Sequence, residues 1–163
     1  MIYEVEGDIL LSGASATVHG VGPDDDFQNG LAFALRNRWP SMYKDFRHFC
    51  HTRHPRPGQA WFWGGPGGER LVALFTQEPP KKKGAHPEKA TLPHVNHALR
   101  ALRGIVEAEG FESVALPRVA TGVGGLDWEE VRPLIETHLG DLPIPVYVYS
   151  TYVPGQRADE PEE

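Results

Sequence analysis

Apolar residues recur along the chain in six short stretches of strand length. Two of them alternate with polar residues at period two, and others are continuous apolar runs, a pattern typical of strands covered on both faces. Glycine and proline bound several of these stretches, as expected where strands end in turns. The predicted strands are Ile2–Glu6, Ala14–His19, "RPGQAWFWGG", "RLVALFT", "SVALP" and "VYVYS".

Four other segments have the spacing of amphipathic helices. They are Leu31–Trp39, Met42 to about His51, a segment beginning at Leu92, and Leu126–Leu139. Ser41 is expected to cap the second helix, Thr91 and Gly110 to bound the third, and Asp127 with Glu130 to form a capping pair for the fourth. Pro133 is expected to disturb the first turns of that last helix.

Strands that alternate with helices predict one α/β domain, a three-layer α/β/α sandwich around a mostly parallel, mixed sheet. We place the domain at residues 1–153 and a solvated tail at residues 154–163. The length of 163 residues and the apolar content of 40% suit one globular core. One cysteine and the absence of a signal-like or membrane-spanning stretch favour a cytoplasmic protein that is not bound to a membrane.

The formal net charge of −6 argues against a broad nucleic-acid-binding surface but leaves room for a local anion site. "PRVATGVGGLDWEEV", residues 117–131, offers such a site, because glycines follow a buried strand and precede a helix. Free amides at such a junction can bind phosphate, and ligands of open α/β sheets lie beyond the carboxyl ends of strands. A merely tight connection between strand and helix is the alternative.

Several motifs, in order along the chain, together resemble the macrodomain family of ADP-ribose-binding proteins. They are "YEVEGDIL", "QNGLA", "WPSMYKDF", "PRVATGVGGLDWEEVRPLIE" and "VYVYSTY". The resemblance is greatest to the bacterial branch related to the terminal ADP-ribose glycohydrolase and to antitoxins that remove ADP-ribose from DNA. It implies binding of ADP-ribose and hydrolysis of ADP-ribosyl linkages on a protein, a nucleic-acid end or a small ester. A non-catalytic reader of ADP-ribose is the alternative.

The resemblance also implies residue roles. Asp8 and Ile9 would bind adenine, although Asp8 can instead cap a turn. Tyr149 and Tyr152 would flank the base, but Tyr147 and Tyr149 share one face, so one of the two implied tyrosines can belong to the core. Two loops would hold the diphosphate and the distal ribose. Their residues are Gln28, Asn29, Gly30 and Leu31 in the first, and Thr121, Gly122, Val123, Gly124, Gly125 and Leu126 in the second.

The chain departs from the family pattern at three positions. One is near Gly124, where the glycohydrolase branch has an acidic residue and this glycine has no side chain. His19 stands where many macrodomains have an asparagine. His19 and Asn29 are the candidate catalytic residues, and the alternative for His19 is a buried structural role. Gln77 stands where the glycohydrolase branch has a lysine, and glutamine cannot form a Schiff base. The sequence therefore favours attack by water or a reader function. Lys81, Lys82 and Lys83 are interpreted as a solvated run.

Two histidine-rich segments and one acidic run contain residue types that bind metal ions. The first holds His48, Cys50, His51 and His54, the second His86, His94 and His97, and the acidic run spans residues 24–26. A closed zinc site needs four converging ligands, and acidic runs also serve solubility. We therefore expect no metal and no cofactor.

Overall fold

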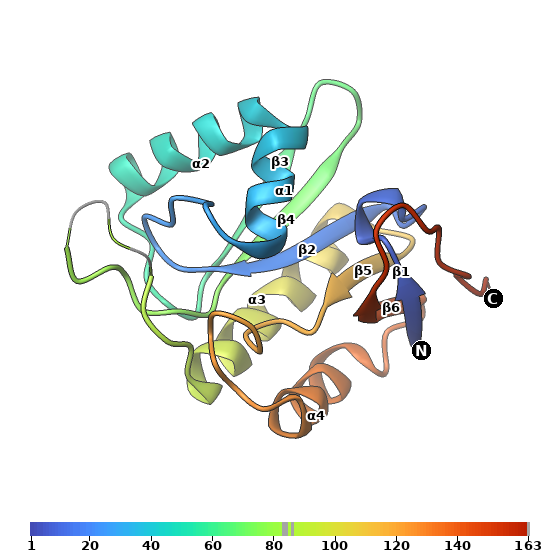
Figure 1. Cartoon of the computed structure of the whole chain (residues 1–163). Coiled ribbons are helices and arrows are strands. Elements are labelled where there is room, and N and C mark those ends of the chain that lie inside the picture. The colour runs from blue at the N-terminus through green and yellow to red at the C-terminus, as the bar shows by residue number, and fades with distance from the viewer. Residues whose placement is uncertain (83–84, 86, 163) are drawn as a thin grey trace.

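A six-stranded mixed sheet forms the middle layer of the protein (Figure 1). The computed structural model describes residues 1–82, 85 and 87–162. The strands lie in the order β1-β6-β5-β2-β4-β3, and all neighbours are parallel except β3, which is antiparallel to β4. Their bounds are β1 Ile2–Gly7, β2 Ala16–Val21, β3 Ala60–Gly64, β4 Arg70–Phe75, β5 Val114–Pro117 and β6 Val146–Tyr152.

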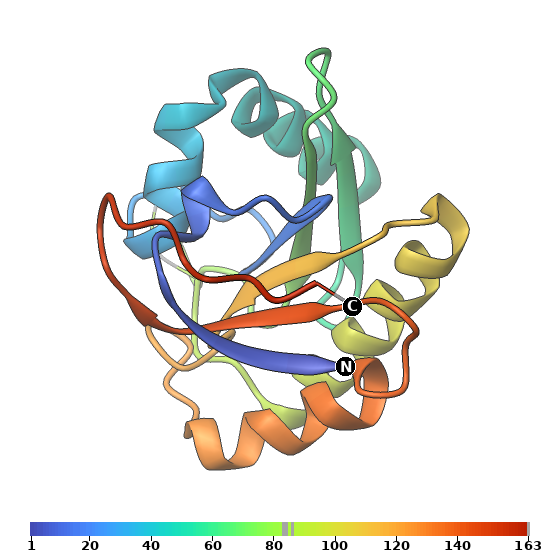
Figure 2. The same ribbon diagram turned by 90° about the vertical axis from the view of Figure 1, so that its right-hand side faces the viewer.

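Helices cover both faces of this sheet, which confirms the predicted three-layer α/β/α fold (Figures 1 and 2). On one face lie α1 (Gly30–Arg38) and α2 (Pro40–Arg53), and on the other α3 (Leu92–Glu109) and α4 (Trp128–Leu139). A short 3-10 helix, η1 (Ile9–Leu11), follows β1. None of the helices that the structure describes combines the length and apolar character needed to cross a bilayer.

The apolar stripe that predicted α3 is the part of the helix that enters the core. Val95, Leu99 and Leu102 are fully buried and pack against a cluster that includes Val18 of β2 and Leu74 of β4. Each such side chain contributes roughly 1.5–3 kcal/mol through burial. This packing fixes the strand layer whose carboxyl ends carry the site described below.

The helix ends agree with the predictions for α3 but not for α2 and α4. Thr91 accepts a hydrogen bond from the His94 amide at 3.3 Å, and Gly110 ends α3 with φ of +66°. Ser41 is not a cap, because α2 already begins at Pro40, whose fixed φ suits a first turn.

Asp127 holds the N-cap position of α4, but its side chain makes no capping bond, so the expected capping pair is absent. Pro133 does not interrupt α4. The proline lacks the amide that would bond the carbonyl of Glu129, and because Glu129 is exposed, water can satisfy that carbonyl.

The segment after β6 runs back across the sheet, over Tyr147 and Tyr149 (Figure 2). Val153 donates its amide to the Gly7 carbonyl at 3.0 Å, and Asp8 donates its amide to Gln156 at 2.7 Å. Most residues of this segment are exposed, although their backbone is tied to the domain by these bonds. The segment therefore covers the part of the sheet that α1 and α2 leave open.

Candidate functional site

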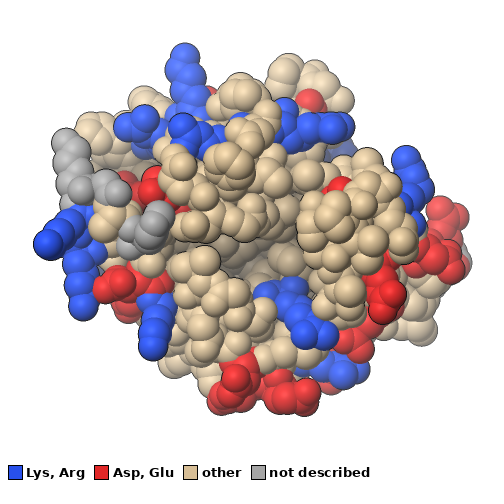
Figure 3. Space-filling view, viewed as in Figure 1, with Lys and Arg blue, Asp and Glu red and all other residues tan. Residues whose placement is uncertain are grey.

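A cavity of about 200 Å³ lies beyond the carboxyl ends of the parallel strands, where ligands of open α/β sheets bind. Four segments of the chain line it: the end of β2, the start of α1 with the loop before it, the loop after β4, and the loop after β5. Figure 3 shows the molecule hollowed near the centre of this face. The predicted site residues His19, Asn29 and Gly124 meet here, although they are far apart in the sequence.

The glycine-rich loop presents free backbone donors to this cavity. Gly122, Val123 and Gly124 line it, and within the described part of the chain their amides donate no hydrogen bond. The loop is held by the amide of Gly125 on the Gly122 carbonyl and the amide of Leu126 on the Ala120 carbonyl, both at 3.0 Å. Consecutive backbone amides that point into a concave space are a donor arrangement that binds anions in proteins, so this loop is the candidate anion site.

Two glycines of this loop have different surroundings. A Cβ on Gly124 would lie 2.6 Å from the Ala120 carbonyl oxygen, so this glycine allows the loop to fold upon itself. A Cβ on Gly122 would meet open space, so the fold does not require a glycine there. Thr121, Gly125 and Leu126 of the predicted loop do not line the cavity; the Thr121 hydroxyl donates to the Arg118 carbonyl at 2.7 Å.

His19, on β2, is a buried polar residue that lines the cavity. Its side chain is 2% exposed, its ring lies edge-on to Phe27 at 5.7 Å, and neither ring nitrogen has a partner among the described residues. Burial lowers the pKa of His19 to about 4, so the imidazole is neutral at pH 7. Such a ring can exchange hydrogen bonds with a ligand, but it is a weak base.

Residues of the first predicted loop line two spaces, this cavity and a larger groove beside it. Asn29, Gly30 and Leu31 line the cavity, at the start of α1. Gln28 instead lines a larger groove on the other side of the same loop. Asn29 holds the N-cap position of α1 without a side-chain capping bond, and it has contacts elsewhere.

The residues expected at adenine lie outside the cavity, around the end of β1. The Asp8 carboxylate caps η1 by accepting the Leu10 amide at 3.0 Å, and it also accepts the Gly155 amide at 2.9 Å. Tyr149 is buried and donates to Glu160 at 2.6 Å, whereas Tyr152 is 58% exposed. Tyr152 pairs with Gly7 in the sheet, so it is the tyrosine free to contact a base near Asp8.

Gln77 and the lysines after it occupy different surroundings. Gln77 is buried, lines the cavity and donates to the Glu88 carbonyl at 3.1 Å. Lys81 pairs with the Glu88 carboxylate at 3.2 Å and Lys82 is exposed. Lys83 lies outside the described residues.

The histidine-rich segments do not assemble a cluster where the structure describes them. Within that part of the chain, no three His, Cys, Asp or Glu side chains are placed to hold a metal ion. Cys50 is buried, and burial raises the pKa of its thiol to about 11, which makes it a poor metal ligand at neutral pH. His86 lies outside the described residues.

Sequence reasoning missed two charged residues of the cavity. Arg118 is exposed and lines it, with its guanidinium 5.4 Å from the Trp128 ring centre. Asp25 supplies the carboxylate of the lining, and it accepts the amides of Gly22 at 3.1 Å and Phe27 at 2.9 Å. Arg118 directly follows the buried strand, which was a usable signal; Asp25 could not be told from its acidic neighbours.

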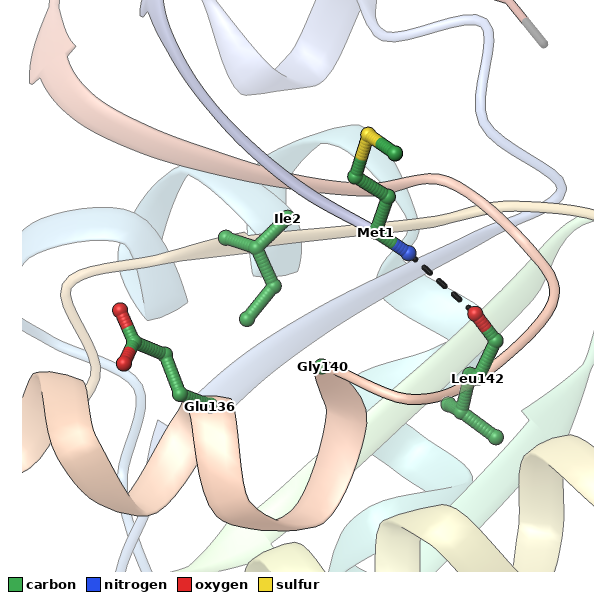
Figure 4. A pocket seen from close by; sticks show the side chains of 5 residues that line it. All are labelled: Met1, Ile2, Glu136, Gly140 and Leu142. Carbon is green, nitrogen blue, oxygen red and sulfur yellow. Dashed lines mark hydrogen bonds between the residues drawn. The ribbon is translucent and has the colours of Figure 1, made fainter.

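A second depression, of about 450 Å³, lies at the opposite edge of the sheet, where β1 begins and α4 ends (Figure 4). The Met1 amino group donates to the Leu142 carbonyl at 3.2 Å beside it. Its one acidic side chain, Glu136, pairs with Arg132 at 3.4 Å. Among the described residues that line this depression the acidic side chain is already paired, so we take the cavity at the carboxyl ends as the candidate site.

No family model matches the chain. Curated relatives do. A Thermosipho africanus DNA ADP-ribosyl transferase–DNA ADP-ribosyl glycohydrolase fusion protein is 28% identical over 162 residues, covering 89% of this chain and 40% of that protein. The DNA ADP-ribosyl glycohydrolase of Mycobacterium tuberculosis is 28% identical over 145 residues, with 88% and 40% covered. The chain thus spans about two fifths of these relatives. An ADP-ribose 1''-phosphate phosphatase of Chaetomium globosum is 26% identical, with 88% of both chains covered.

Solved structures agree with these relatives on the fold. The macrodomain of Thermus aquaticus DarG superimposes with a TM-score of 0.81 at 23% identity, covering 92% of this chain and 98% of that one. Thermosipho africanus DarTG in complex with ADP-ribose gives a TM-score of 0.79 at 22% identity, with 96% and 42% covered. The protein therefore has the macrodomain fold, and its sequence is similar to those of DNA ADP-ribosyl glycohydrolases.

Proposed function

We propose that the protein binds ADP-ribose in this cavity and hydrolyses the bond between ADP-ribose and a modified DNA base. The observation that carries the proposal is the meeting of three unpaired amides, at Gly122, Val123 and Gly124, with the unpartnered imidazole of His19 in one cavity. The names of the curated relatives supply the reaction class and the DNA substrate.

In this proposal the ligand extends from the end of β1 to the end of β2. The diphosphate binds the amides of residues 122–124, with the Arg118 guanidinium adding a positive charge at the rim. The base lies against Tyr152 and receives contacts from Asp8 and Ile9. Each Asp8 oxygen already accepts one amide but keeps a second lone pair for the adenine amine. The distal ribose then reaches His19 and Asn29.

The reaction we propose uses water as the nucleophile, because Gln77 has no amine with which to form an imine. The water oxygen bonds to the anomeric carbon of the distal ribose while the bond from that carbon to the base breaks. The base leaves with the bonding electron pair and takes a proton from solvent, and the Asp25 carboxylate accepts the proton of the water. Glycosidases use a carboxylate in the same role.

His19 in this scheme positions the ribose or the water as a neutral hydrogen-bonding group. An imidazole with its pKa near 4 removes a proton poorly at pH 7. The same observation favours the second candidate function, a non-catalytic reader of ADP-ribose. A reader needs the anion site and the base site but no group that accepts a proton.

Calorimetry with ADP-ribose and with AMP tests the binding part. ADP-ribose should bind tighter, because AMP lacks the second phosphate and the distal ribose that the loop and His19 would contact. Equal affinities for the two nucleotides would refute the placement of the diphosphate at residues 122–124.

Turnover of an ADP-ribosylated oligonucleotide by Asp25→Asn and His19→Ala then separates the roles. Asp25→Asn should lower the rate about a hundredfold or more while ADP-ribose still binds, as expected for a lost general base. His19→Ala should weaken binding together with the rate. Borohydride should trap no covalent adduct. Binding of ADP-ribose without turnover of any ADP-ribosylated substrate would establish the reader.

A further inference from the structure

A groove of about 970 Å³ lies beside the cavity, between α2 and the loop that follows β4. Its α2 wall carries Lys44, Arg47, His48 and His51, which are spaced three and four residues apart and so occupy one face of the helix. The opposite wall carries Lys81 and Lys82. Figure 3 shows lysine and arginine side chains gathered over α2 and over this loop.

The cationic groups of the α2 wall are available to a ligand. Lys44 and Arg47 are exposed, and neither forms an ion pair with a described residue. The guanidinium groups of Arg36 and Arg47 lie 4.2 Å and 6.0 Å from the centre of the Tyr43 ring. The aromatic ring thus holds both arginines in the groove without neutralising them. The N–H donors of Arg47, and those of Arg36 that do not bond the Asp26 carbonyl, can then meet phosphate oxygens.

Acidic residues are present in the groove but confined to one place, residues 24–26 on the loop between groove and cavity. The Asp25 carboxylate accepts one amide on each oxygen, from Gly22 and from Phe27, which holds it at the loop. Asp26 accepts the Gln28 amide at 3.2 Å, and its carbonyl accepts Arg36 at 2.9 Å. The walls therefore stay basic, although the chain as a whole carries a formal charge of −6.

The groove and the cavity lie on the two sides of this loop. Asp25 lines both spaces, and Gln28 in the groove is followed by Asn29 in the cavity. A macromolecule attached to the distal ribose would leave the cavity at the side where the groove begins.

We propose that this groove binds the phosphodiester backbone of the nucleic-acid strand that carries the ADP-ribose. The inference rests on the proposed function for the identity of the strand, and on the charges of α2 and residues 81–82 for its position. Phosphates on the strand match Lys44 and Arg47 on the α2 wall and the exposed Lys82 opposite them, whereas an acidic protein segment would have to supply carboxylates at the same spacing.

The test variant reverses two charges in the groove by combining Lys44→Glu with Arg47→Glu. The control variant combines Arg70→Glu with Arg100→Glu. The control makes the same change of charge at exposed positions outside the groove. Binding of an unmodified single-stranded DNA 20-mer is followed by fluorescence anisotropy over a salt series. Binding of ADP-ribose is followed by calorimetry.

The groove variant should bind the DNA at least about tenfold more weakly, and its salt slope should fall by about 1.4, the value for two lost phosphate contacts on a single strand. ADP-ribose affinity should be unchanged, and the control should bind DNA nearly as the wild type does. The groove proposal would be refuted if the wild-type protein did not bind the DNA. It would also be refuted if the groove variant and the control lost DNA affinity to the same extent. If the wild-type protein did not bind ADP-ribose but only the groove variant lost DNA affinity, the proposed function would be refuted and the groove proposal would be supported.

Discussion

Replacing His19 by leucine should make the protein more stable while it weakens ADP-ribose binding. The imidazole is buried with a donor and an acceptor that have no partner among the described residues. A buried unpaired polar atom costs about 1–3 kcal/mol, and leucine of similar size removes both. The variant loses the edge contact with Phe27, which opposes the gain by about 0.5–1.5 kcal/mol. We expect a net stabilisation of about 0.5–5.5 kcal/mol at pH 7.

The gain should grow on acidification. The pKa of His19 falls from 6.5 to about 4 in the folded protein because of burial. Between these values the unfolded chain binds a proton that the folded chain does not, so wild-type stability falls as the pH falls through this window. At about pH 4.5 the loss amounts to about 2.5 kcal/mol, from roughly 1.4 kcal/mol per pKa unit. Leucine has no such loss.

Urea unfolding of both proteins at pH 7 and at about pH 4.5 measures these terms. The difference between the two proteins isolates His19, because His138, whose pKa is also lowered by burial, titrates in both. Calorimetry measures the ADP-ribose affinity of both proteins. A variant less stable than the wild type at both pH values, or a difference that does not change with pH, would refute the description of His19 as buried and unpaired.

Three further predictions follow from the loop and the C-terminal segment. Gly122→Glu should abolish ADP-ribose binding without lowering the melting temperature, because its Cβ meets open space while its charge repels the diphosphate, and Gly122→Ala is the uncharged control. Gly124→Ala should lower the melting temperature, since the added carbon would lie 2.6 Å from the Ala120 carbonyl oxygen; an unchanged melting temperature would contradict this packing. Glu160→Ala should lower the free energy of unfolding in urea by about 1–3 kcal/mol, because the carboxylate accepts the hydroxyls of Ser12 and Tyr149, both at 2.6 Å. A decrease below about 0.5 kcal/mol would mean that these hydrogen bonds do not form in solution.

The sequence predicted those features that depend on short-range pattern. The period of α3 and its caps at Thr91 and Gly110 are local, and so is the glycine loop that follows a buried strand. The start of α2 was misplaced because Pro40 and Ser41 both favour a helix start, and only packing chooses between them.

Tertiary placement decided the remainder. The sequence could not tell that Asp25 rather than its neighbours lines the cavity, or that Gly124 and Gly122 differ in what surrounds them. Nor could it show that Tyr149 lies under the C-terminal segment while Tyr152 stays exposed, because that depends on where a charged, proline-containing segment lies on the sheet.

The order of the strands has a consequence for how the protein folds. β1 lies at the edge of the sheet, and its one neighbour is β6, so the first strand pairs with the last. During synthesis β1 must therefore wait until β6 (Val146–Tyr152) has been made, while β2 and β4 can already pair. Closing so long a loop is entropically costly and slows folding. A nascent chain that ends before β6 has a four-stranded sheet at most, with β1 exposed as an unpaired strand that other chains can capture.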